Sequence, residues 1–220
     1  MTVYTDFEHS IASARSLTAM YVELRRIRKL GKRGRLPPEH QDLLWLPRSA
    51  VVAAISSLDA YVHAVVLGRL PHVLRSNPVP APLCVAMAEI LPIKNGDGFR
   101  EALPVITSAN AEAELTNRFN EKVLAFNSYQ APEKVQGAYA LIGHSGVFDT
   151  VAATWPGPNT SADDLKRYLA SYVKRRNQIA HEGDREASGD VRPMQPAYAN
   201  GCTSFIENLV ARLNRIVFEP

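Results

Sequence analysis

The sequence predicts an all-α protein, a bundle of about five to seven helices that forms a single domain over 1–220. Apolar residues recur at every third or fourth position in several long stretches, the spacing that places them on one face of a helix. No stretch alternates apolar and polar residues as a half-buried strand would, so we interpret the Asn-Gly-Asp-Gly of 95–98 as a tight turn rather than a sheet hairpin. With 220 residues, 46% of them hydrophobic, the chain can bury one sizeable core.

Two long helices are expected in the N-terminal third of the chain. The first spans 5–30, with Thr5 as its cap and a broad apolar side. The second spans 39–74, follows a pair of prolines, and bends or restarts at Pro47. Its centre is apolar on nearly every side, so several neighbouring helices must cover it.

The apolar centre of the second helix is expected to be core rather than a membrane span. Its longest apolar run, 50–67, is interrupted by Asp59 and His63, and it is too short and too polar to cross a bilayer. The start of the chain lacks the basic-then-apolar arrangement of a signal peptide. Cys84 and Cys202 stand alone without a pairing pattern. We therefore expect a cytoplasmic protein with no membrane partner.

The rest of the chain is expected to form short helices followed by two longer ones. After a loop at 76–82, short helical pieces occupy 83–155, of which 111–126 is the clearest. A helix over 161–181 follows, and a closing helix over 198–217 completes the chain.

The helix over 161–181 has well-marked ends. Ser161, with Asp164 three residues later, is a capping-box start. Gly183 suits the left-handed conformation that terminates helices. The last two turns therefore hold Arg176, Asn177 and His181 close together. The partial negative charge of a helix end favours a protonated imidazole, which suits His181 to proton transfer near neutral pH.

A dense basic cluster lies at the end of the helix over 5–30. Within eleven residues it contains Arg25, Arg26, Arg28, Lys29, Lys32, Arg33 and Arg35. One interpretation is a solvated helix end whose cations complement the helix dipole. The other is a patch that contacts phosphates. The net charge of +3 permits a polyanionic partner without requiring one.

Asp59 lies on the core-facing side of the helix over 39–74, where an unpaired carboxylate would be costly. His63, one turn further on, is the simplest partner. The alternative is that Asp59 orients Arg176 or His181 across the core. In both cases Asp59 and His63 are candidate supporting residues.

Two other motifs point to different chemistry and are weaker. The segment 143–147, Gly-His-Ser-Gly-Val, resembles a nucleophile elbow, but the final glycine is replaced by Val147 and no strand precedes it. The six histidines are scattered, with no metal-binding spacing among them. We therefore expect neither a bound metal nor another cofactor.

Arg176 and His181 form an Arg-x4-His pattern, which occurs readily by chance. The chain contains a second copy of the same pattern at Arg35 and His40. That copy spans two prolines in a linker, whereas Arg176 and His181 end a capped amphipathic helix. Their structural context therefore separates the two.

The string 176–181, Arg-Asn-Gln-Ile-Ala-His followed by a glycine at 183, resembles the signature of the HEPN superfamily. The stretch 57–63 also resembles the second core helix of the RiboL-PSP-type bacterial branch of that superfamily. The resemblance covers most of the chain in layout but only about thirty residues in specific letters. HEPN toxins silenced by AMP transfer carry a tyrosine two residues beyond the histidine, where this chain has Gly183, so the resemblance does not extend to that regulation.

This resemblance implies an HEPN-like helical bundle that forms a homodimer, with two copies of the motif facing each other to build one RNA-cleaving site. Arg176, Asn177 and His181 would be the catalytic residues of a metal-independent endoribonuclease. Such enzymes act in toxin–antitoxin, phage-defence or stress systems, so an antitoxin or another regulatory protein is a possible further partner.

The chemistry of the residues agrees with that implication. Metal-free RNA cleavage needs a group that moves protons, which suits His181, and a cation that stabilises charge on phosphorus, which suits Arg176. Asn177 can bind a phosphate or orient the imidazole. Further candidate RNA contacts are Lys174, Arg175, Arg25, Arg26 and Arg28. The alternative is a non-catalytic helical module that binds RNA, a nucleotide or a protein.

Overall fold

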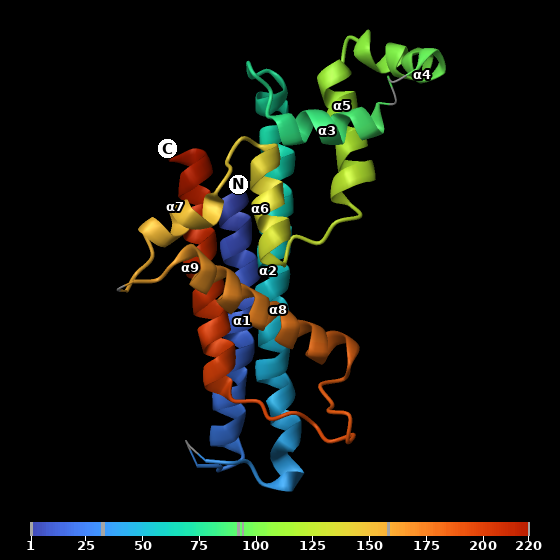
Figure 1. Cartoon of the computed structure of the whole chain (residues 1–220). Coiled ribbons are helices and arrows are strands. Elements are labelled where there is room, and N and C mark those ends of the chain that lie inside the picture. Colours follow the sequence, from blue (N-terminus) through green and yellow to red (C-terminus); the bar gives the residue numbers. More distant parts are fainter. Residues whose placement is uncertain (1, 32–33, 92, 94, 158, 220) are drawn as a thin grey trace.

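The computed structural model describes residues 2–31, 34–91, 93, 95–157 and 159–219, and within these ranges the regular structure is helical (Figure 1). The all-α prediction is therefore confirmed. The described ranges contain nine α-helices and two short helical segments of other types, η1 and η2. In chain order they are α1 Val3–Ile27, η1 Pro38–Leu44, α2 Trp45–Leu74, α3 Ala81–Ile90, α4 Gly96–Ile106, α5 Ala111–Phe119, η2 Asn120–Leu124, α6 Pro132–Leu141, α7 Val147–Ala153, α8 Ala162–His181 and α9 Pro196–Phe218.

The core is built around α2, which packs against α1, α8 and α9. Figure 1 shows α1, α2 and α9 running side by side as three long helices, with α8 lying obliquely across them. Side chains on several sides of α2 are buried, as its apolar sequence predicted. Buried residues of α2 include Val51, Ile55, Leu58, Val62, Val65, Val66 and Leu70. Because α8 packs directly on α2, α2 fixes where the end of α8 lies.

The segment Pro38–Leu74 is, by length and composition alone, long and apolar enough to cross a membrane. The expectation that this region is too short and too polar was therefore wrong on those two criteria. However, 56% of its most apolar window is buried inside the molecule. The core helix of a folded protein passes the same length and composition test, and the packing of α2 against α1, α8 and α9 accounts for its apolar sequence.

The middle of the chain has more helices than predicted. It divides into α3 to α7, so the expected total of five to seven was too low. The segment 95–98 is not a free turn: Asn95 caps α4, its side-chain oxygen accepting a hydrogen bond from Gly98 N at 2.7 Å. Figure 1 shows α3, α4 and α5 projecting from one end of the bundle, well away from the last turn of α8.

The boundaries of the long helices differ slightly from those predicted. α1 begins at Val3 because Thr2, not Thr5, is its cap. The change from η1 to α2 occurs at Trp45, two residues before Pro47, so the proline lies in the first turn of α2 where its missing N–H is tolerated. These shifts leave the order and packing of the helices unchanged.

Candidate active site

The N-terminal end of α8 is fixed by the predicted capping box. Ser161 Oγ accepts a hydrogen bond from Asp164 N at 3.1 Å, and Asp164 Oδ2 accepts one from Ser161 N at 3.1 Å. Leu165, Leu169 and Ile179 are buried and define the face of α8 that packs on the core. The side chains of Arg176 and His181 therefore have a fixed direction relative to that core.

The C-terminal end of α8 is also where the sequence placed it, at His181. Gly183 has a positive φ of 60° and Asp184 one of 56°. The reversal lets Asp184 N donate to Gln178 O at 2.9 Å, which satisfies a carbonyl of the last turn. It also turns the Asp184 side chain inward, where it is fully buried.

Arg176, Asn177 and His181 lie together, as predicted. Arg176 Nη1 is 3.2 Å from Asn177 Oδ1 and 3.3 Å from His181 Nε2. An arginine nitrogen can only donate, so in this arrangement His181 Nε2 accepts and a neutral ring carries its proton on Nδ1. No ion pair joins Arg176 to a carboxylate within the ranges the structure describes. The guanidinium is thus held by neutral partners at an exposed helix end.

Arg175 points the other way and belongs to a buried ionic cluster. Its Nη1 lies 2.5 Å from Asp184 Oδ1, and its Nη2 donates to Pro193 O at 3.0 Å. Asp184 also accepts a hydrogen bond from Arg48 Nε of α2. Arg175 was predicted to contact RNA. Its side chain is only 13% exposed and holds the chain after α8 in place instead.

Lys174 is exposed and lies on a shallow groove beside the motif. The groove has a volume of about 350 Å³ between α8 and the start of α6. It is lined by Ala131, Pro132, Glu133, Ala170, Val173, Lys174, Asn177, Gln178 and Glu182. Of the three motif residues, the groove lining contains Asn177, so Lys174 and Asn177 share one groove.

Asp59 and His63 do not support the motif. Asp59 accepts hydrogen bonds from the segment after η2: from Tyr129 N at 2.5 Å and from Gln130 Nε2 at 2.9 Å. His63 Nε2 lies 3.0 Å from Asn120 Oδ1. These bonds to Tyr129 and Gln130 replace both roles predicted for Asp59. Those roles were a local pair with His63 and an orienting contact to Arg176 or His181. A backbone amide satisfies the carboxylate that the sequence left unpaired.

The two exposed arginines at the end of α1 that were predicted to contact RNA have carboxylate partners within the molecule. Arg26 pairs with Glu23 at 2.5 Å, and Arg28 pairs with Asp42 at 2.9 Å. The structure therefore favours the solvated, internally paired helix end over the phosphate patch.

Arg25, the third predicted RNA contact of this cluster, is buried. It donates to Tyr21 Oη at 2.9 Å and to the Gly31 carbonyl. These contacts tie the end of α1 to the turn that follows it. Lys32 and Arg33 of the same cluster lie outside the described residues.

The other chemical motifs lack the structural context they need. The segment 143–146 is part of the loop between α6 and α7, and Val147 begins α7. No strand of the described chain precedes it, so it is no nucleophile elbow. The described residues contain no group of three or more His, Cys, Asp or Glu that could hold a metal ion. Burial raises the pKa of Tyr172 on α8 to about 12, so this phenol stays protonated at neutral pH.

Sequence reasoning missed Arg48 and Arg192, which surround Asp184 and the end of α8. Arg192 pairs with Glu182 at 2.9 Å. The one signal in the sequence was the Gly-Asp pair after the helix, which can turn a carboxylate inward, where it needs cationic partners.

No family model, curated protein or solved structure matches this chain.

Proposed function

We propose that the protein is a metal-independent endoribonuclease of the HEPN type, with Arg176, Asn177 and His181 as its catalytic residues. The proposal includes an HEPN-like bundle, a homodimeric composite site and a cytoplasmic location. It also places the enzyme in a toxin–antitoxin, phage-defence or stress system, where an antitoxin or other protein would hold it in check.

One observation carries the proposal: Arg176 Nη1 lies 3.3 Å from His181 Nε2, and no carboxylate of the described chain pairs with that guanidinium. The adjacent Arg175 takes the ion pair with Asp184. This division leaves Arg176 able to exchange neutral hydrogen-bond partners for phosphate oxygens, which bind a guanidinium more strongly. The contact supports the proposal, because an imidazole and a guanidinium this close together can act on one phosphodiester.

The reaction needs one proton acceptor and one proton donor. His181 takes the proton of the ribose 2′-hydroxyl as its oxygen bonds to phosphorus, and Arg176 stabilises the charge on the phosphorane. The bond from phosphorus to O5′ then breaks, and O5′ receives a proton from the His181 of a second copy. The products are a 2′,3′-cyclic phosphate and a 5′-hydroxyl, with no water or metal consumed in the step.

The test is cleavage of a mixed RNA pool by purified full-length protein in the presence of EDTA, with the new ends characterised. Fragments with 2′,3′-cyclic phosphate and 5′-hydroxyl ends are expected. A pool of 2′-deoxy oligonucleotides of the same sequences should remain intact, because the nucleophile is missing. RNA binding without cutting would instead support the non-catalytic module, and cleavage that EDTA abolishes would overturn the metal-free mechanism.

A further inference from the structure

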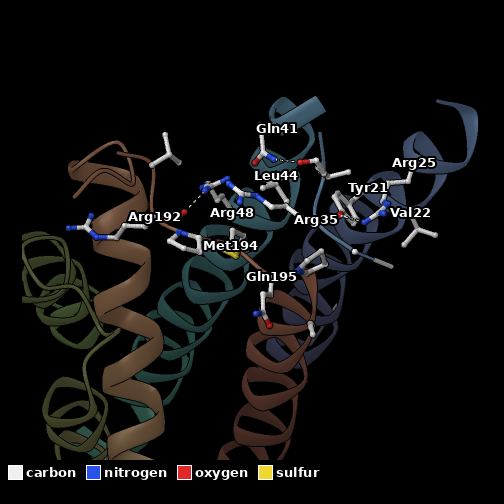
Figure 2. Close-up of a pocket in the computed structure, with 16 residues that line it drawn as sticks. Tyr21, Val22, Arg25, Arg35, Gln41, Leu44, Arg48, Arg192, Met194 and Gln195 are labelled. Carbon is white, nitrogen blue, oxygen red and sulfur yellow. Dashed lines mark hydrogen bonds between the residues drawn. The ribbon is translucent and has the colours of Figure 1, made fainter. Parts of the chain in front are cut away.

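A large cavity lies away from the motif, at the end of the bundle where α1, η1, α2 and the start of α9 meet. Its volume is about 880 Å³. It is lined by Tyr21, Val22, Arg25, Gly34, Arg35, Leu36, Gln41, Leu44, Arg48, Val191, Arg192, Pro193, Met194, Gln195, Pro196 and Ala197 (Figure 2). The size is in the range of sites for small molecules.

The charge of the wall is one-sided. The described lining contains four arginines, Arg25, Arg35, Arg48 and Arg192, and no aspartate or glutamate. Two of the four have carboxylate partners outside the lining: Arg192 pairs with Glu182, and Arg48 shares Asp184 with Arg175. Figure 2 shows Arg25 on the α1 side of the cavity and Arg48 beside the 191–197 segment, while the Arg192 side chain points away from the other labelled residues. A concave, low-dielectric wall of one sign concentrates ions of the opposite sign. The cavity is thus built to attract an anion.

Arg48 provides the strongest reason for a bound anion. Its side chain is 2% exposed and shares the single carboxylate of Asp184, 0% exposed, with Arg175. Two guanidinium groups around one carboxylate leave one positive charge in excess in a buried place. An uncompensated buried charge is costly, and an anion in the cavity beside Arg48 would compensate it.

Arg35 adds a cation that is already exposed to the cavity. No ion pair links it to a carboxylate in the part of the chain that the structure describes. Gln41 and Gln195 are neutral hydrogen-bonding groups on the same wall, and Leu36, Leu44 and Met194 supply apolar surface. Such a wall suits a ligand with a multiply charged end and an uncharged part.

We propose that this cavity binds a phosphorylated small molecule, with its phosphate groups against Arg35 and Arg48. Phosphate fits because guanidinium forks match its oxygens and because a multiply charged group is needed to meet several cations at once. The proposal is independent of the ribonuclease proposal, since it concerns a different face and needs no cleavage.

The site also lies close to the chain that follows α8. Arg192 lines the cavity and pairs with Glu182, the residue after His181, and Arg48 pairs with Asp184. A ligand that binds Arg48 therefore acts on Asp184, in the segment that follows the motif helix. If the ribonuclease proposal also holds, cleavage will respond to the ligand.

The test is isothermal titration calorimetry of the full-length protein with inorganic tripolyphosphate as the probe, at about 0.15 M ionic strength. One site per chain is expected. Arg35→Gln removes a phosphate contact, and Gln195→Glu puts a negative charge on the exposed rim. Arg35→Gln should weaken binding by about tenfold or more, because a charge-assisted hydrogen bond is worth that much. Gln195→Glu should weaken binding because its carboxylate repels the phosphate groups.

Matched controls separate the cavity from the overall charge of the protein. Arg26→Gln is the control for Arg35→Gln, because Arg26 lies near the end of α1 but outside the cavity lining. Gln136→Glu is the control for Gln195→Glu, because Gln136 is exposed on α6 and also lies outside the lining. Both should leave binding unchanged. The proposal is overturned if the wild type shows no saturable binding, if test and control variants weaken it equally, or if citrate binds more tightly than tripolyphosphate. It is also overturned if Arg35→Gln lowers affinity only for RNA.

Discussion

The ends of α1 and α8 both crowd arginines into a single helical turn, but the guanidinium groups have different partners. At the end of α1, Arg26 and Arg28 pair with the carboxylates of Glu23 and Asp42. At the end of α8, the side-chain partners of Arg176 among the described residues are His181 and Asn177, which are neutral acceptors. A cluster of cations in a sequence therefore does not by itself mark a phosphate site. Whether a guanidinium can bind phosphate depends on whether it already pairs with a carboxylate.

The largest effect should come from His181, because it is the proposed proton carrier. His181→Ala should lower the rate of RNA cleavage by about 10² to 10⁴-fold, the usual contribution of a positioned acid or base. The fold should persist, since His181 is an exposed residue at the helix end. Single-turnover cleavage and a urea unfolding curve measure the two properties.

His40→Ala is the matched control for His181. His40 completes the second Arg-x4-His pattern, with Arg35, and lies near Arg28 at the end of α1. Its removal should leave cleavage unchanged. Equal losses in the two variants, or full activity of His181→Ala in a clean preparation, would contradict the assignment.

Arg175 and Arg176 are neighbours in sequence and should respond in opposite ways. Arg176→Gln should lower the cleavage rate by about 10² to 10³-fold, as expected for a donor that stabilises transition-state charge, with little change in the urea midpoint. Arg175→Gln should lower the urea midpoint, because it removes a cation from the buried Asp184. An active Arg176→Gln variant would remove the main reason for the ribonuclease proposal.

Sequence reasoning predicted α8 well because every signal for that helix is local. The capping box at Ser161, the apolar stripe and Gly183 each act within a few residues, and the structure has all three. Asn177 and His181 are four residues apart and share a face of the helix, and the long side chain of Arg176 reaches the His181 ring from five residues away. Fold class and candidate motif were therefore accessible without a structure.

The partners of buried charges were not accessible, because they come from distant segments. Arg48 lies 136 residues before Asp184, and no local pattern links them. Asp59 accepts a hydrogen bond from the backbone amide of Tyr129, and a partner of this kind cannot be recognised from residue types in a sequence. The division of the middle region into α3 to α7 was missed for a related reason, since short helices are defined by tertiary packing more than by propensity.

The buried carboxylate of Asp184 should matter more for stability than the carboxylates of the exposed ion pairs. Asp184→Asn should reduce the free energy of unfolding by about 3 to 5 kcal/mol, because it leaves Arg48 and Arg175 buried without an anion. Asp42→Asn, which removes the exposed partner of Arg28 at the other helix end, should leave the urea midpoint unchanged. Similar midpoints for the two variants would mean that Asp184 is not the centre of the cluster.

The smallest effects concern RNA affinity and its dependence on salt, measured in the His181→Ala background to prevent cutting. Each phosphate contact to single-stranded RNA contributes about 0.7 to the slope of log affinity against log salt. Lys174→Gln should lower that slope by about this amount, because Lys174 is exposed on the groove beside Asn177. The double variant Arg26→Gln, Arg28→Gln should leave the slope unchanged, since both guanidinium groups already have carboxylate partners. If the double variant lowers the slope more than Lys174→Gln does, RNA exchanges those surface ion pairs for phosphates. The end of α1 would then be part of the RNA-binding surface despite its internal pairing.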